Sequence, residues 1–476
     1  MKEGYIKQGD RKKILLLTDD IRVHSGVAQI GREIITNTAH HYNWCQLAGS
    51  VKHPEKGKIQ DLSDDINKSE DIKDSYVKLY PVDGYGDGDI LREIIKVEKP
   101  DAILLITDPR YFQWVFQMED EIRTKIPIAY LNIWDDMPAP QYNEEFYESC
   151  DALFGISKQT VAINKIVLGD KAKDKVIEYI PHGLDNNKFF PIVEKDEEFT
   201  KFKNQLTRGV EKEFILLFNS RNIRRKSIPD AITAWRLFID TLTVEEKSKV
   251  LFILHTDPVS DAGTDIPAVI DYIMGDDDEA IVISNQKLPF THMNYLYNMA
   301  DSVILLSSAE GWGLALTESL LAGTPFIANV TGGMQDQMRF VDENGNWYTN
   351  SEKIPSNQFG TYKEHGTWAL PVYPKAMGMV GSPQTPYIWD SRCDFRDARD
   401  RIVELYKMSN VERKERGNLG REWALSDEAG FTAKHMGNKF TEGMEKLFST
   451  WIPREHFTFW KDTDFKSRKL NHKLEY

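Results

Sequence analysis

The chain has 476 residues, more than one hydrophobic core accommodates, so we expect two domains of roughly 200 residues each with a ligand cleft between them. Its 41% hydrophobic and 28% charged residues are typical of a globular protein and exclude a disordered chain. The formal charge of -14 opposes a large nucleic-acid-binding surface, except where basic residues cluster locally, as in the tail from Lys466 to Lys473.

Cysteine usage and hydropathy bear on the cellular compartment. Cys45, Cys150 and Cys393 are far apart and odd in number, which favours reduced thiols over a disulfide framework or a metal cluster. The N-terminal residues are polar, and no stretch has the length and apolar character needed to span a bilayer. We therefore expect a cytoplasmic protein, with peripheral membrane association left open.

Short apolar runs alternate with amphipathic segments along the chain. The run KILLLTDD from Lys13 predicts a buried parallel strand, and a glycine turn and helical spacing follow it. The same alternation resumes after a charged stretch, so we predict an α/β protein with two doubly wound parallel sheets. The further predicted strands are residues 77–82, 102–106, 128–132 and 152–156, then 214–220, 251–255, 281–284, 303–306 and 326–328.

These patterns divide the chain into a first domain at 1–190, a linker at 191–212 and a second domain at 213–445. Residues 344–390 are rich in Gly, Pro, Tyr and Trp without a clear period, so they form either an ordered insertion or a mobile loop. We expect the last segment, 446–476, to pack back on the first domain because it contains too many aromatic residues for a free tail. Those residues are Trp451, Phe457, Phe459 and Trp460.

The most informative segment is SVILLSSAEGWGLALTESLLAGTPFIANVTGG, residues 302–333. It predicts a buried strand, a glycine-bearing loop that contains Glu310, and a helix from about 315 to 322 that ends at Gly323. The loop glycines let a ligand approach the backbone, and the start of the helix attracts an anion such as a diphosphate. Glu318 lies in the first turns of this helix, where its carboxylate suits hydroxyl groups beyond the phosphates, such as those of a ribose.

Glu310 and Glu318, with seven residues between them and LLAGTPFIA after them, resemble the signature of retaining GT-B glycosyltransferases. That family comprises the glycogen-synthase-like and sucrose-synthase-like enzymes, also described as glycosyltransferase family 4 or glycosyl transferases group 1. The resemblance implies two Rossmann-like domains that face each other across a cleft, with the acceptor bound by the first domain and the nucleotide-sugar donor by the second. It also implies that Glu318 holds the ribose, that Glu310 contacts the donor sugar, and that the adjacent loop binds the donor through Gly311, Trp312, Gly313 and Leu314.

Two more segments resemble the donor site of the same family. Arg221 and Lys226, five positions apart after a predicted strand, are similar to its basic pair that neutralises the donor diphosphate. With Glu310 they are therefore assigned as catalytic, since fixed cations stabilise the charge that develops on the leaving group. Gly26 resembles the glycine-rich loop that faces the donor phosphates. A solvated basic face and an ordinary strand-to-helix turn are the alternative interpretations of these two segments.

Contacts with the acceptor or the reacting sugar are less closely specified. The segment IPHGLDNNKFFP at 180–191 resembles the interdomain stretch of the family, with His182 where asparagine is commoner. Asp108, Asp135 and Asp136 follow predicted strands, where ligands gather in open sheets, although aspartates also cap helices at such places. We take these four residues as candidate contacts, while a hydrogen-bonded structural histidine remains the alternative for His182.

The expected activity is transfer of a hexosyl or pentosyl group from a nucleoside-diphosphate sugar to a hydroxyl, with retention of configuration. We expect no cofactor and no metal ion, because no cluster of metal ligands is visible in the sequence. A glycan or a lipid-linked glycan is the expected acceptor. Three alternatives stay open: a hydroxylated DNA base as acceptor, a sugar-nucleotide epimerase, and a degenerate sugar-nucleotide-binding subunit.

Overall fold

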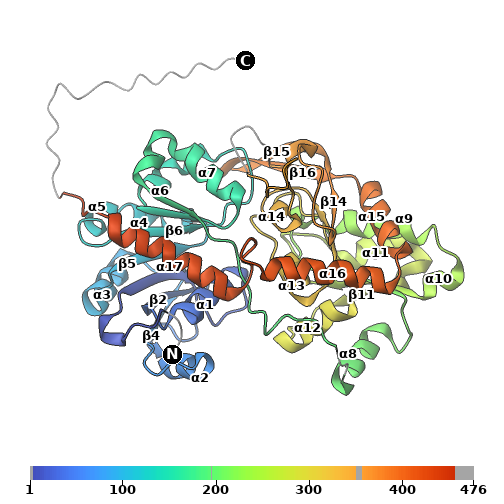
Figure 1. The fold of residues 1–476 in the computed structure, drawn as a ribbon, viewed down its shortest axis with the longest axis horizontal. Coiled ribbons are helices and arrows are strands. Elements are labelled where there is room, and N and C mark those ends of the chain that lie inside the picture. The colour runs from blue at the N-terminus through green and yellow to red at the C-terminus, as the bar shows by residue number, and fades with distance from the viewer. Residues whose placement is uncertain (1–3, 194–195, 350–355, 456–476) are drawn as a thin grey trace, which may run out of the picture.

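The structure is a computed structural model that describes residues 4–193, 196–349 and 356–455. It consists of two α/β domains that lie side by side, each built around its own parallel sheet (Figure 1). The fold class predicted from the alternating apolar runs is confirmed. Within the described ranges, no helix is both long and apolar enough to cross a bilayer.

The first domain contains an eight-stranded sheet in the order β3-β4-β2-β1-β5-β6-β7-β8. Neighbouring strands are parallel, apart from the antiparallel edge pair β3 and β4. The interior strand β1 is almost wholly buried, because helices cover both faces of a parallel sheet. The strands are β1 (Lys13–Asp19), β2 (Asn43–Ser50), β3 (Gln60–Asp61), β4 (Val77–Asp83), β5 (Ala102–Ile106), β6 (Ile128–Asn132), β7 (Ala152–Gly155) and β8 (Val176–Tyr179).

Helices connect these strands, and several begin with a capping side chain. Ser25, the residue before α1, accepts a hydrogen bond from the backbone N–H of Ala28, which satisfies one free donor of the first turn. The helices are α1 (Gly26–Thr38), α2 (Ser63–Glu70), α3 (Gly88–Glu98), α4 (Gln113–Phe116), α5 (Glu119–Ile122), α6 (Glu144–Glu148) and α7 (Lys158–Leu168). The 3-10 turns are η1 (Gln8–Asp10), η2 (Pro109–Phe112), η3 (Gln141–Asn143) and η4 (Gly169–Asp174).

Strand β2 is absent from the sequence prediction because its segment, NWCQLAGS, mixes polar and apolar residues. The structure nevertheless buries it next to β1. The Gln46 side-chain amide donates to the Asp19 carbonyl at 2.7 Å, and the Asn43 amide donates to the Gln8 carbonyl at 2.9 Å. Each hydrogen bond gives a buried side-chain amide nitrogen a partner, which lowers the cost of burying these residues, whereas the Asn43 Oδ1 has no hydrogen-bond partner among the described residues.

The second domain contains a six-stranded parallel sheet in the order β11-β10-β9-β12-β13-β14. Its strands are β9 (Phe214–Asn219), β10 (Val250–His255), β11 (Ile281–Ser284), β12 (Ser302–Leu305), β13 (Phe326–Asn329) and β14 (Ala369–Val372). Its helices are α9 (Ile228–Ile239), α10 (Val244–Ser248), α11 (Ile266–Met274), α12 (Phe290–Met299), α13 (Leu314–Ala322), α14 (Met334–Met338), α15 (Phe395–Lys407) and α16 (Asn410–Leu425), with 3-10 turns η5 (Arg224–Lys226), η6 (Gly275–Ala280) and η7 (Gln358–Gly360).

The segment expected to be a linker, residues 191–212, contains a helix of its own. This helix is α8 (Glu197–Thr207), and its Phe202 packs on Tyr295 of α12 with ring centroids 5.9 Å apart. The chain thus joins the packing of the second domain before it enters β9. The charged side chains on the exposed face of α8 account for the weak apolar pattern in the sequence.

The chain crosses between the domains twice, and the two crossings are hydrogen-bonded to each other. The Leu184 N–H donates to the Phe431 carbonyl at 3.1 Å, and the Ala433 N–H donates to the Leu184 carbonyl at 2.8 Å. The return to the first domain therefore lies near residue 432, before the expected boundary at 445. From there α17 (Ala433–Thr450) packs along α1 on the first domain (Figure 1).

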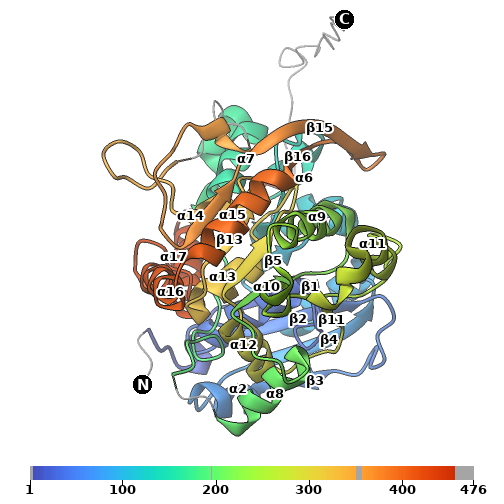
Figure 2. The same cartoon turned by 90° about the vertical axis from the view of Figure 1, so that its right-hand side faces the viewer.

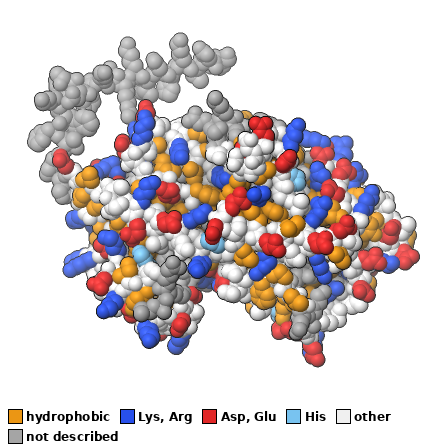
Figure 3. All heavy atoms as spheres, in the orientation of Figure 1, with side chains coloured by type: hydrophobic (Ala, Val, Ile, Leu, Met, Phe, Trp, Pro, Cys, Tyr) orange, Lys and Arg blue, Asp and Glu red, His pale blue; other side chains and the backbone are white. Residues whose placement is uncertain are grey.

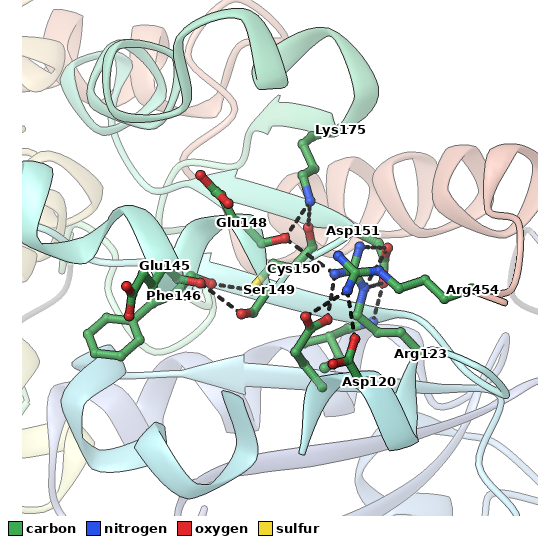
Figure 4. A network of polar contacts seen from close by, with 12 residues as sticks. Asp120, Arg123, Glu145, Phe146, Glu148, Ser149, Cys150, Asp151, Lys175 and Arg454 are labelled. Atoms are coloured by element: carbon green, nitrogen blue, oxygen red, sulfur yellow. Dashed lines mark hydrogen bonds and ion pairs between the residues drawn. The ribbon is translucent and has the colours of Figure 1, made fainter. Parts of the chain in front are cut away.

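A group of ion pairs anchors the chain beyond α17 to the first domain (Figure 4). The Arg454 guanidinium pairs with Asp120 at 3.0 Å, and the Arg454 N–H donates to the Arg123 carbonyl at 2.9 Å. Arg123 is itself buried and pairs with Asp151 at 2.6 Å. The C-terminal segment up to residue 455 therefore contacts the first domain. Phe457, Phe459, Trp460 and the basic tail from Lys466 to Lys473 lie outside the described residues.

The described residues of the segment 344–390 are 344–349 and 356–390. They supply β14 and most of a hairpin formed by β15 (Pro374–Ser382) and β16 (Thr385–Cys393) (Figure 2). The hairpin is tied to the first domain, since the Trp389 N–H donates to the Met137 carbonyl at 2.8 Å. The described part of this segment therefore contributes a strand to the second sheet and a hairpin that contacts the first domain.

Candidate active site

A cleft of about 720 Å³ lies between the two domains. Its first-domain wall comes from the segments that follow β1, β4, β5, β6, β7 and β8, together with the start of α1. Its second-domain wall comes from the loops that follow β9, β10, β11 and β12, together with the start of α13. The carboxyl ends of both parallel sheets therefore face one cleft, which is where open α/β sheets bind ligands.

Glu310 lies in this cleft, on the loop between β12 and α13, and is only 7% exposed. Its carboxylate forms ion pairs with Lys226 and, at 2.9 Å, with the Arg225 guanidinium. Burial by itself would raise the pKa of Glu310, but these two cations outweigh burial and hold its pKa at about 2. Glu310 is therefore a carboxylate at neutral pH.

The basic pair predicted from the sequence is divided between two environments. Lys226 is buried against Glu310, whereas Arg221 is exposed, lines the cleft and has no ion-pair partner in the described part of the chain. Arg225 connects the two walls of the cleft, because its guanidinium pairs with Glu310 and also lies 3.6 Å from the Asp135 carboxylate of the first domain. The sequence could not distinguish Arg225 from its neighbour Arg224, since only the η5 turn decides which of the two enters the cleft.

Glu318 projects from α13 and is also buried at the cleft. Its carboxylate accepts hydrogen bonds from the Tyr297 hydroxyl and, at 3.2 Å, from the Asn219 amide. Burial raises the pKa of Glu318 to about 7. Neither Asn219 nor Tyr297 was singled out from the sequence, because they come from β9 and α12 and meet Glu318 only in the folded domain.

The glycines of the loop before α13 allow backbone segments to approach closely. A side chain at Gly311 would place its Cβ 2.7 Å from the Ile133 carbonyl of the first domain. Gly313 adopts φ of 88° at the N-cap of α13, a left-handed conformation that favours glycine. Leu314 follows it and lies close to Gly26, where an added Cβ would be 3.4 Å from the Leu314 side chain. The predicted donor loop and the start of α1 therefore lie next to each other across the cleft.

Trp312 and His182 form a packed part of the cleft wall. Trp312 is 2% exposed, and its indole N–H donates to the Thr317 hydroxyl at 2.8 Å. Its ring packs edge-on against His182, with centroids 5.9 Å apart. Burial lowers the pKa of His182 to about 3, so this imidazole is neutral at pH 7. Its Nδ1 is buried without a hydrogen-bond partner among the residues that the structure describes.

Of the three candidate aspartates, only Asp135 lines the cleft. Asp136 is fully buried between the domains, where its carboxylate accepts from the Gln159 amide at 3.1 Å and the Thr331 hydroxyl at 2.8 Å. Asp108 caps the turn η2 and pairs with Arg110. The described cleft lining therefore does not include the candidates Asp108 and Asp136, whose carboxylates serve local or interdomain hydrogen bonding.

Replacing Asp136 by asparagine is expected to make the protein more stable, increasingly so as the pH rises. Burial raises the pKa of Asp136 from 3.8 to about 7, so the folded protein keeps this carboxyl protonated at pH values where the unfolded chain ionises it. The free energy of unfolding therefore falls as the pH rises from 3.8 to about 7, whereas an asparagine at this position does not titrate. Three pKa units correspond to at most roughly 4 kcal/mol. Denaturant unfolding of both proteins from pH 4 to 8 measures this difference, and parallel pH profiles would contradict it.

Comparisons with known proteins match one segment of the chain to a family model. Residues 280–354 match the family model described as glycosyl transferases group 1. Mannosylfructose-phosphate synthase of Agrobacterium fabrum is 22% identical over 203 residues, which cover 41% of this chain and 41% of that relative. The aligned part is thus less than half the length of the curated relative.

Solved structures resemble nearly the whole chain. Sucrose-phosphate synthase of Thermosynechococcus elongatus superposes with a TM-score of 0.65 at 15% identity, covering 92% of this chain and 100% of that one. Anabaena HepE, solved with UDP and glucose, has a TM-score of 0.62 at 13% identity, with coverage of 92% and 100%. The chain therefore shares the fold of these solved structures, and residues 280–354 of its second domain match the glycosyl transferases group 1 model.

Proposed function

We propose that this chain transfers a glycosyl group from a nucleoside-diphosphate sugar to a hydroxyl group, with retention of configuration. The observation that carries the proposal is the cluster of Glu310 with Arg225 and Lys226, in the same cleft as Glu318. The cations suit the donor diphosphate together with the start of α13, and Glu318 suits the ribose hydroxyls. HepE, which shares the fold, was solved with UDP and glucose.

In this mechanism the side chains bind, orient and neutralise charge. The donor diphosphate competes with Glu310 for Lys226, and the released carboxylate then accepts hydrogen bonds from the donor sugar. As the bond from the anomeric carbon to the phosphate oxygen breaks, the acceptor oxygen bonds to that carbon on the same face. This same-face attack conserves the configuration, and the departing phosphate takes the hydroxyl proton. Arg221, Arg225 and Lys226 stabilise the charge on the leaving group.

We also propose that the reaction needs no metal ion, since three cations from the end of β9 and η5 can neutralise the diphosphate. We propose that the protein acts in the cytoplasm, either free or associated with the surface of a membrane. An assay with a chelator tests metal independence. Unchanged transfer is expected with EDTA, and loss of transfer that Mg²⁺ restores would contradict it.

A thermal-shift screen with UDP, GDP, ADP and their common sugars tests donor binding. A ligand at a hundred times its dissociation constant should stabilise the protein by about 2.7 kcal/mol. Replacing Glu318 by glutamine should abolish most of the shift, whereas replacing Tyr272, which is 90% exposed on α11, by alanine should not. No shift with any nucleotide would contradict the proposal, and a shift accompanied by an altered free sugar without transfer would favour an epimerase.

A carbohydrate acceptor is preferred over a hydroxylated DNA base. The chain carries a formal charge of -14, which repels a polyanion on average. On the face shown in Figure 3, lysine and arginine side chains are interspersed with aspartate and glutamate, so this face presents no extended basic surface. The basic tail from Lys466 to Lys473, which suggested DNA, lies outside the described residues.

A further inference from the structure

Charge is unequally divided between the two walls of the cleft. The lysine and arginine side chains that line it, Arg221, Arg225, Lys226 and Lys287, all come from the second domain. In the described residues, the first-domain wall contributes the carboxylates of Asp19 and Asp135 and the imidazoles of His24 and His182, but no lysine or arginine. Asp135 already lies 3.6 Å from the Arg225 guanidinium, whereas Asp19 has no ion-pair partner in the described part of the chain. Lysine and arginine can therefore neutralise the donor diphosphate on one wall only, and an anion on the opposite wall would meet the carboxylate of Asp19.

Nearby cations of the first domain are already neutralised. Arg22 lies just beyond Asp19 but pairs with Asp20 and with Glu55, each at 2.7 Å. Arg110 likewise pairs with Asp108 and turns toward the hairpin, where it donates to the Gln384 carbonyl at 2.8 Å. Neither arginine lines the cleft. The amino end of α1, at Gly26, faces the start of α13 on the donor side.

The same wall presents groups that bind neutral sugar rings. Tyr111 is 57% exposed, and its ring lies against that of Tyr85 with centroids 5.0 Å apart. An aromatic face exposed in a cleft suits the apolar face of a pyranose ring. The carboxylate of Asp19 is held by two hydroxyls, those of Ser25 at 2.6 Å and Tyr85 at 2.5 Å. Its remaining lone pairs can accept hydrogen bonds from acceptor hydroxyls.

We propose that the acceptor is an uncharged carbohydrate whose ring stacks on Tyr111 and whose hydroxyls bind Asp19, and that it carries no phosphate. This inference rests on the proposed transferase function. It separates this chain from two proteins that it resembles, which are named as synthases of phosphorylated disaccharides, mannosylfructose-phosphate and sucrose-phosphate. A phosphate in this subsite would face the carboxylate of Asp19, with no lysine or arginine among the described residues of this wall to balance it.

Acceptor competition tests the proposal once the thermal-shift screen has identified a bound nucleotide sugar. Transfer to glucose and maltose is compared with transfer to glucose 6-phosphate, fructose 6-phosphate and an oligonucleotide that contains 5-hydroxymethylcytosine. We expect kcat/KM for at least one neutral sugar to exceed that for either sugar phosphate by tenfold or more. Preference for a sugar phosphate, or transfer to the oligonucleotide alone, would overturn the proposal.

Two tyrosine variants separate the stacking surface from general damage. Replacing Tyr111 by alanine should raise KM for the neutral sugar about tenfold or more, whereas Tyr111→Phe should retain stacking and a near-normal KM. The exposed Tyr272→Ala variant is the control. Equal KM values for the alanine variant and the parent would refute stacking. Tyr111 lies on the wall opposite Glu318, so nucleotide binding should persist in these variants. If the parent protein itself binds no nucleotide, that result would instead count against the transferase function.

Replacing Asp19 by asparagine tests the charge argument separately. The variant should bind neutral sugars less well, and the ratio of kcat/KM between neutral and phosphorylated acceptors should fall several-fold, because the carboxylate that repels a phosphate is removed. A merely structural role would lower transfer to both acceptors equally. An unchanged ratio would therefore overturn the electrostatic part of the proposal.

Discussion

Replacing Lys226 by alanine is expected to lower kcat/KM for glycosyl transfer by about 10² to 10³-fold, equivalent to roughly 2.7–4 kcal/mol of transition-state stabilisation. Lys226 is 7% exposed and pairs with Glu310 at the position proposed for the donor diphosphate. Loss of its ammonium leaves the developing charge of the leaving group less balanced. It also leaves Glu310 with Arg225 as its remaining cationic partner.

Arg224 is the matched control for this experiment, since it belongs to the same η5 turn, is exposed and does not line the cleft. The Arg224→Ala variant should transfer at nearly the parental rate. Steady-state kinetics with a fixed acceptor compare the two variants, and circular dichroism checks that both are folded. Similar rates for Lys226→Ala and Arg224→Ala would show that the pair with Glu310 has no catalytic role.

Replacing Gly183 by valine is expected to destabilise the protein by about 3–5 kcal/mol, combining overpacking with the loss of two hydrogen bonds. A Cβ at Gly183 would lie 2.1 Å from the Thr432 carbonyl, where the two crossings between the domains meet. The crossings would have to separate, which breaks the hydrogen bonds that join Leu184 to Phe431 and Ala433. The relative position of the two cleft walls depends on this junction, so transfer should also decline.

Gly378→Val is the control for this second substitution, because Gly378 lies in the exposed strand β15, where an added Cβ would meet open space. Its stability should change little. Urea unfolding followed by tryptophan fluorescence measures both variants, and equal midpoints for Gly183→Val and Gly378→Val would contradict the packing argument. Mutation of the hairpin leaves the interdomain crossing intact, which makes the comparison specific.

Local patterns predicted the elements that support the donor site. The run FILLFNS became β9, and the helix expected from about 315 to 322 is observed as α13, ending at Gly323 with φ of 75°. These predictions succeeded because strand burial and helix termination depend on residues close in the sequence. β2 was missed since its polar residues find partners in segments that are distant along the chain.

The sequence by itself therefore determined the α/β class, the two sheets, and the placement of Glu310 and Glu318 around the start of α13. Only the tertiary structure decided that Arg225 joins Lys226 at Glu310, that Asp136 is buried between the two domains, and that the described part of the first-domain wall lacks lysine and arginine. The physical reason is that hydrophobic periodicity acts within each element. Ion pairing and burial across the cleft depend instead on which loops the two sheets bring face to face.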